Sequence, residues 1–225
     1  IVGKAVPRMR NYAALLYGIY MGLTALEIIL LLCGGMGIFD ALNTGFASAG
    51  TGGFGVRNNN MAAYSHYSQV VIAIFLVLFG TNFSFYIMLL TKKFKQAFKM
   101  EELWLYIGII AVSTLIISVN ISSLYPTAYD TSIISTAGFG IDDVNRWPEL
   151  SKAVIIIITF IGAMAGSTGG GFKVSRILIL CKEVRKEFAL LVHPRNVRTV
   201  KLDGKTVDHN IMRTTSVFLV VYLGI

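Results

Sequence analysis

The chain has 225 residues and a formal net charge of +8. Hydrophobic residues make up 55% of it, charged residues only 14%, and the mean hydropathy is +0.67. Soluble domains contain about 45–50% apolar and about 25% charged residues, so this composition excludes an ordinary soluble protein and a disordered chain. Two cysteines and three histidines are scattered, which gives no disulfide framework and no pattern of metal ligands. The sequence therefore predicts a membrane protein.

Apolar segments long enough to cross a bilayer occur four times, since a helical span takes about 20 largely apolar residues. They cover residues 11–33, 70–90, 103–121 and, with a glycine-rich interruption, 153–180. A fifth begins at about Ile211 and reaches the last residue, Ile225. Because the chain opens without an initiator Met and stops inside an apolar run, we expect it to be a piece of a longer membrane protein.

Basic residues gather in alternate loops. Seventeen of the twenty Lys and Arg residues lie before the first segment, between the second and third, or within residues 173–213. Cytoplasmic loops of membrane proteins collect Lys and Arg, so we expect the N-terminal end in the cytoplasm and residues 34–69 and 122–151 outside. This distribution accounts for the charge of +8 without nucleic acid. The basic cluster at 182–213 is also suited to anionic lipid or a cytosolic partner.

The two outer stretches contain the same motif. The first copy is Thr51-Gly52-Gly53-Phe54-Gly55, and the second, 85 residues later, is Thr136-Ala137-Gly138-Phe139-Gly140. Each copy follows a short, semi-apolar segment of helix length and precedes a further apolar segment. The sequence therefore repeats a unit of span, short helix, glycine strand and span.

Such a unit has a physical rationale. Non-helical backbone is tolerated at membrane depth only where it is buried in protein or lines a water-filled cavity. A glycine-rich strand can aim consecutive carbonyl oxygens the same way, and these oxygens can replace the hydration shell of a cation. The preceding helix would point its negative C-terminal end at the ion, with Asp40 as the N-cap or a first-turn acid of the first copy. The plain alternative is a pair of glycine-rich turns between spans.

Both motifs resemble the Thr-Val-Gly-Tyr-Gly filter of potassium channels. Two unequal copies in one chain resemble the Trk/Ktr/HKT superfamily of potassium transporters, whose chains carry four non-identical units around one pore. The resemblance implies an all-α polytopic membrane protein in which the backbone of Thr51, Gly52, Thr136 and Ala137 binds potassium. It also implies one pore unit at 1–102, a second at 103–181 with a broken last span, a cytoplasmic connector at 182–210 and the start of a further span at 211–225.

A glycine-rich segment interrupts the fourth apolar segment. Each of its three consecutive glycines disfavours helix by about 1 kcal/mol relative to Ala, and such a break fits an unwound backbone that lines a cavity. The resemblance implies that this segment is the intramembrane gate beneath the filter, formed by Gly166, Ser167, Thr168, Gly169, Gly170, Gly171 and Lys173. Lys173 either closes the pore electrostatically or anchors the segment at the cytoplasmic interface.

Glu27 is the only acidic residue inside a predicted span. A carboxylate within the membrane marks a functional site by default. The alternative is a structural pair between helices, with a basic group elsewhere in the whole protein. Both interpretations stay open on the sequence.

The function that the resemblance implies is potassium uptake through a central pore, with no enzymatic activity and no organic cofactor. It also implies a multi-pass protein of a bacterial inner membrane, a homodimer, and a cytosolic regulatory subunit with nucleotide-binding domains. Three alternatives remain. They are a non-conducting scaffold or regulatory subunit acting through the basic residues 182–213, a homotetrameric channel with duplicated loops, and a sodium-permeable member of the same family.

Overall fold

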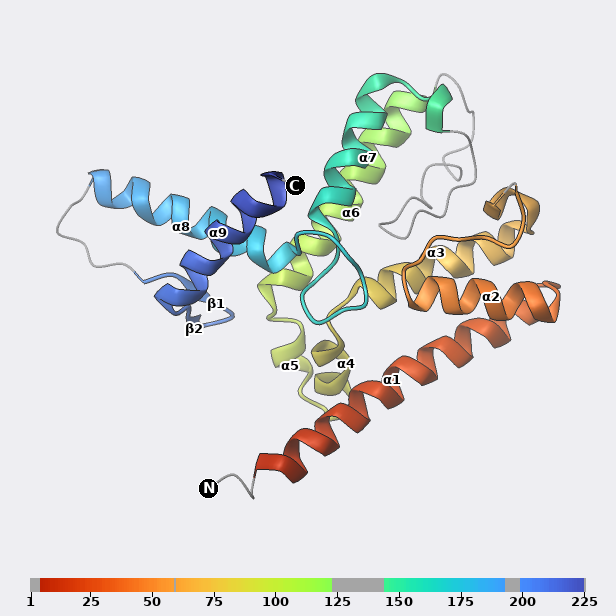
Figure 1. Ribbon diagram of the computed structural model, residues 1–225, viewed down its shortest axis with the longest axis horizontal. Helices are drawn as coiled ribbons and strands as arrows, with labels where there is room; N and C mark the ends of the chain where they lie inside the picture. Colours follow the sequence, from red (N-terminus) through yellow and green to blue (C-terminus); the bar gives the residue numbers. More distant parts are fainter. Residues whose placement is uncertain (1–4, 59, 123–143, 193–198, 225) are drawn as a thin grey trace.

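The computed structural model describes residues 5–58, 60–122, 144–192 and 199–224. Apart from one small hairpin, the regular structure of these residues is helical (Figure 1), which confirms the predicted all-α class. The helices in chain order are α1 Ala5–Cys33, α2 Ile38–Ala49, α3 His66–Gly80, α4 Phe83–Leu90, α5 Phe94–Ala97, α6 Glu101–Ile121, α7 Glu149–Ile161, α8 Val174–Val192 and α9 His209–Gly224. Short 3-10 turns lie at Asn60–Ala63 and Val144–Arg146, and the strands are β1 Lys201–Leu202 and β2 Lys205–Thr206.

The first three helices pack against one another on one side of the molecule (Figure 1). Their shared core contains Leu31, Ile72 and Phe79, all fully buried. Helix α2 lies so close to α1 that a Cβ atom on Gly45 would come within 2.6 Å of Ile28 Cγ1. This packing holds the short helix predicted before the first motif against the first span.

The second predicted span, residues 70–90, is wrong as a continuous helix. Helices α3 and α4 meet at an angle of 88°. The break lies at Thr81 and Asn82, where the Asn82 side chain accepts a 2.8 Å hydrogen bond from Ser84 N–H and caps α4. The run carries no charge, and the prediction of a single span passed over the polar residues Thr81 and Asn82 after Gly80.

The fourth predicted span, expected to be interrupted at Gly166–Gly171, is interrupted over a longer stretch in the structure. Helix α7 ends after 13 residues, and the loop that follows covers residues 162–173. Helix α8 then continues past residue 181 to Val192. By length and composition, two of the described helices qualify as membrane spans, namely α1 from Arg10 and α6, and the bent pair α3–α4 makes a third if counted as one span.

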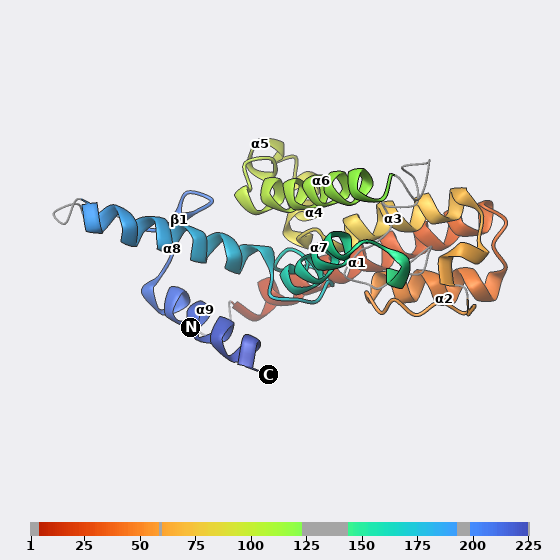
Figure 2. The same ribbon diagram turned by 90° about the horizontal axis from the view of Figure 1, so that it is seen from above.

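The C-terminal half places α6 beside α7, and α8 contacts α6 and extends away from the first three helices (Figure 2). Helices α8 and α9 contact each other, and next to the hairpin Val200 packs with Ile179 of α8 and Met212 of α9. The two strands of the hairpin are antiparallel, with Lys201 opposite Thr206 and Leu202 opposite Lys205. The turn is Asp203-Gly204, with φ of 50° and 78°, as expected for a two-residue hairpin turn.

Candidate functional site

The first glycine motif continues directly from the C-terminus of α2. Gly50 N–H donates to Phe46 O at 2.9 Å, and Gly52 N–H donates to Ala47 O at 2.7 Å. The negative end of the α2 dipole therefore faces the start of the motif. Thr51 and Gly53 have φ of 52° and 72°, so the strand turns twice through the left-handed region.

Contacts on the far side of the motif hold it against the start of α2. Arg57 Nε lies 3.2 Å from Asp40 Oδ2, and the Arg57 guanidinium lies 5.2 Å from the centre of the Tyr64 ring. A Cβ atom on Gly55 would come within 2.9 Å of Asn60 Oδ1, so the following loop folds back onto the motif. Asp40 is indeed a first-turn acid, whereas the N-cap is Gly37, which makes no side-chain cap.

The glycine segment of the fourth span is a closed loop. Gly162 and Gly171, with φ of 74° and 86°, meet at its base, where a Cβ atom on Gly171 would lie 2.6 Å from Gly162 Cα. Ala163 N–H donates to Gly170 O at 3.3 Å, and Lys173 N–H donates to Ile161 O at 2.9 Å. The loop thus begins and ends at nearly the same point, as compact Ω-loops do.

The loop is seated in the bend between α3 and α4. Met164 N–H donates to Gly80 O at 3.0 Å and Thr168 N–H donates to Phe79 O at 3.3 Å, which satisfies two carbonyls that the end of α3 leaves free. In return, Phe83 N–H at the start of α4 donates to Gly166 O at 3.0 Å. The bend and the loop therefore complete each other's backbone hydrogen bonding.

The loop also contacts the first motif. Thr51 Oγ1 lies 2.8 Å from Gly50 O and 3.3 Å from Thr168 O, so one hydroxyl proton is shared between the motif and the loop. These two parts of the predicted site are 117 residues apart in sequence. The Lys173 ammonium turns back and donates to Gly169 O within the loop itself.

A residue that the sequence interpretation passed over supports the loop from a third side. Glu102, near the start of α6 and only 5% exposed, accepts hydrogen bonds through Oε1 from Ala165 N–H at 2.7 Å and from Ser175 N–H at 3.1 Å. The one sequence signal was a pair of acids in the first turn of the third span, which is common at helix N-termini. Its role depends on two backbone groups more than 60 residues away.

Aromatic side chains cover the end of the loop. Phe172, which is 1% exposed, stacks on Phe160 with ring centres 5.8 Å apart and also contacts Phe218 and Tyr222 of α9. The Arg176 guanidinium lies 4.0 Å from the centre of the Phe218 ring. Helix α9 is therefore packed against the loop.

The structure places Glu27 between α1 and α2, fully buried. Its carboxylate faces Ser48 on α2. Among the described residues, neither Glu27 oxygen has a hydrogen-bond partner, and the same is true of the Thr44 and Ser48 hydroxyls. Glu27 thus belongs to a buried polar group behind the helix that carries the motif.

The second motif, residues 136–140, and the short segment before it lie outside the described residues. Its predicted role is therefore carried by the sequence repeat alone. Within the described ranges, no three His, Cys, Asp or Glu side chains gather where they could hold a metal ion. The groups available to an ion at the first motif are backbone carbonyls and the Thr51 hydroxyl.

Long apolar helices, a short helix that runs into a glycine strand, and a broken span define an all-α polytopic membrane protein. A family model, TrkH, described as a cation transport protein, matches residues 113–225, which is half of the chain. The chain belongs to this family of cation transport proteins.

Similar proteins extend the match over nearly the whole chain. The Trk system potassium uptake protein TrkH of Escherichia coli K12 is 32% identical over 97% of the chain, and TrkG of the same strain is 27% identical over 97%. The crystal structure of the potassium transporter TrkH from Vibrio parahaemolyticus superposes with a TM-score of 0.87 at 29% identity, over 96% of this chain and 50% of that one. The chain spans about half the length of the curated relatives it matches, 48% in both Escherichia coli proteins.

Proposed function

We propose that the chain forms part of a potassium-uptake pore in which Thr51–Gly55 is one strand of the selectivity filter and residues 166–173 are the gate. The observation that carries this proposal is the contact between Thr51 Oγ1 and Thr168 O, because it joins the start of the glycine strand to the glycine loop. The names of the relatives, Trk system potassium uptake proteins, support potassium as the transported ion.

In this proposal the ion sheds water and binds backbone carbonyl oxygens of the strand, where the C-terminal end of α2 adds favourable negative potential. Thr136–Gly140 supplies a second strand, and the remaining strands belong to the rest of the whole protein. The loop at residues 166–173 closes the path below the filter and opens by leaving the bend between α3 and α4. The Lys173 ammonium, bonded to Gly169 O, keeps the loop in its closed form.

The same proposal covers the setting of the pore. The N-terminal end of the chain lies in the cytoplasm of a bacterium, and the spans cross its inner membrane. The whole protein is a homodimer controlled by a cytosolic nucleotide-binding subunit, and transport involves no covalent chemistry. The basic residues of 182–213 lie on the side that faces this subunit.

Ion flux into liposomes that carry the full-length protein tests the filter assignment. Gly53 has φ of 72°, so Gly53→Ala strains the strand, and we expect rubidium uptake to fall at least about tenfold, a cost of about 1.4 kcal/mol. Gly108→Ala in α6 is the matched control, because its new Cβ atom meets nothing within 4 Å. Gly138→Ser tests the second motif in the same assay, with weaker discrimination of rubidium from sodium as the expected result.

Unchanged rubidium flux in Gly53→Ala together with unchanged discrimination of rubidium from sodium in Gly138→Ser would overturn the filter assignment. Absence of flux from the folded wild-type protein, with the cytosolic partner supplied, would favour the scaffold alternative. Equal rubidium and sodium uptake by the wild type would assign the pore to the sodium-permeable alternative.

A further inference from the structure

We propose that the N-terminus of α6, Glu101 and Glu102, is a mechanical link through which the cytoplasmic hairpin β1–β2 positions the glycine loop. The proposal rests on the proposed function, which takes this loop as the gate and places the hairpin in the cytoplasm. Glu102 is then a positioning residue for the gate, and Lys182 and Asp203 are positioning residues for Glu101. Glu102 contacts the loop and Glu101 contacts the hairpin and α8.

The loop end of the link is the Glu102 carboxylate. A single oxygen, Oε1, accepts from Ala165 N–H, just after the entry to the loop, and from Ser175 N–H, just after its exit. Ser175 lies in the first turn of α8, where backbone N–H groups are free and the helix dipole favours a negative charge. One carboxylate therefore clamps both flanks of the loop to α6.

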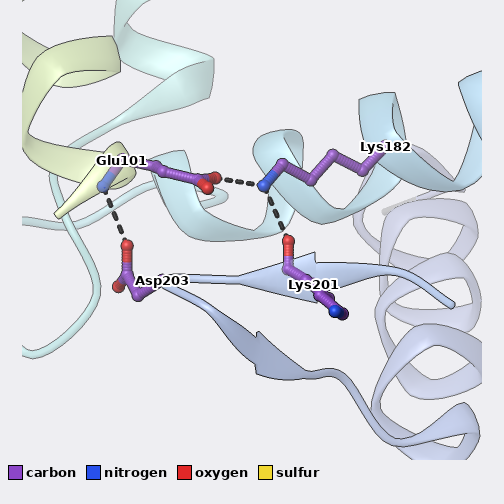
Figure 3. Close-up of polar contacts among 4 residues, drawn as sticks. All are labelled: Glu101, Lys182, Lys201 and Asp203. Carbon is purple, nitrogen blue, oxygen red and sulfur yellow. Dashed lines mark hydrogen bonds and ion pairs between the residues drawn. The ribbon is translucent and has the colours of Figure 1, made fainter. Parts of the chain in front are cut away.

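The hairpin end of the link is shown in Figure 3. Asp203, at the tip of the hairpin, accepts a 2.8 Å hydrogen bond from Glu101 N–H. It supplies the side-chain cap that Met100, the N-cap residue of α6, does not provide. Lys182 of α8 pairs with the Glu101 carboxylate and also donates to Lys201 O at 2.7 Å.

The loop end and the hairpin end are connected because Glu101 and Glu102 are neighbours in the first turn of α6. A displacement of the hairpin removes the Asp203 cap and one acceptor of Lys182, and the frayed first turn of α6 then carries the Glu102 carboxylate with it. Asp203 and Gly204 are exposed, so the tip is open to a cytosolic partner. A groove of about 990 Å³ lies beside it, lined among others by Gln96, Lys99 and Val207.

Two variants of the full-length protein release the hairpin end without touching the loop. Asp203→Gly removes the acceptor but keeps a residue suited to φ of 50°, and Lys182→Met removes both donated bonds but keeps an apolar stem. Asp203→Asn is the conservative rescue, because the amide oxygen still accepts from Glu101 N–H. Lys186→Met is the matched control, since Lys186 pairs only 3.6 Å away with its neighbour Glu187 on α8.

Hydrogen exchange measured by mass spectrometry reads the link directly. We expect peptides that cover residues 163–175 to exchange at least fivefold faster in Asp203→Gly and Lys182→Met, and at the wild-type rate in Asp203→Asn and Lys186→Met. Faster exchange confined to residues 199–208 would overturn the link. If size-exclusion chromatography shows that Asp203→Gly or Lys182→Met is misfolded, the other of these two variants still tests the link.

Rubidium flux through the same four variants separates the link from the proposed function. Faster exchange in the loop together with a severalfold change in flux supports both. Faster hydrogen exchange in the loop with unchanged rubidium flux supports the link but shows that the loop is not the gate. Unchanged hydrogen exchange in the loop would overturn the proposed link, whether or not the rubidium flux changes.

Discussion

Gly170 and Gly171 are neighbours in the glycine loop but have different surroundings. Gly171 has φ of 86°, and an added Cβ atom would lie 2.6 Å from Gly162 Cα and 2.9 Å from Gly162 N. An added Cβ atom on Gly170 would meet nothing within 4 Å. Of these two neighbours, only Gly171 is required to be glycine, because it lies at the crossing at the base of the loop.

This difference gives a paired prediction. We expect Gly171→Ala to destabilise the protein by about 2–4 kcal/mol, from the left-handed backbone and the clash together, and Gly170→Ala to change stability by less than about 1 kcal/mol. Thermal unfolding of the full-length protein in detergent measures both. Equal loss of stability in the two variants would show that the crossing does not hold the loop.

Substitutions of Glu27 distinguish the two interpretations that the sequence left open, a functional carboxylate in the membrane and a structural pair between helices. Burying a carboxylate without a partner is costly, whereas a Gln of the same shape avoids the charge and can bond to the hydroxyl of Ser48. We therefore expect Glu27→Gln to keep the stability of the full-length protein within about 1 kcal/mol or to raise it, while Glu27→Lys prevents folding.

The same unfolding assay, with rubidium flux beside it, measures both Glu27 variants. A large loss of stability in Glu27→Gln would mean that the whole protein provides a cationic partner for the carboxylate. A loss of flux at unchanged stability would assign Glu27 to the ion path.

Among the helices, the bend between α3 and α4 is where the glycine loop of residues 162–173 packs. Tyr106 of α6 packs over it so tightly that a Cβ atom on Gly80 would lie 2.1 Å from the Tyr106 hydroxyl oxygen and 3.0 Å from its Cζ. The close approach of α6 therefore requires glycine at the end of α3. It also brings the start of α6 within reach of the loop that Glu102 clamps.

A double-mutant cycle tests this packing. We expect Gly80→Ala to cost about 1–3 kcal/mol through overpacking, and Tyr106→Phe to recover more than half of that cost in the double variant, because it removes the nearest atom. Chemical or thermal unfolding of the four proteins gives the coupling energy. Additive effects would mean that α6 shifts away from the bend when Gly80 is replaced.

For the whole molecule, the glycine loop is the point where distant parts of the chain meet. The bend after Phe79, the carboxylate of Glu102, the aromatic rings of α9 and the hydroxyl of Thr51 all contact it. The motif strand itself is open on one side, with Phe54 83% exposed.

The sequence by itself determined the class of protein, because composition and apolar segments are local properties that record contact with lipid. It also determined the short helix before Thr51 and the break near Gly166, where glycines specify the backbone. The match to the TrkH family confirms the resemblance drawn from the two motifs. The roles of filter and gate stay predictions.

Only the tertiary structure decided where the second span bends and what holds the glycine loop. The bend is stable because the amides of Met164 and Thr168 satisfy the carbonyls at the end of α3, and these partners lie more than 80 residues further along the chain. The role of Glu102 likewise depends on two amides that no local pattern reveals. A buried backbone group must find a partner, but the sequence near it does not say which one.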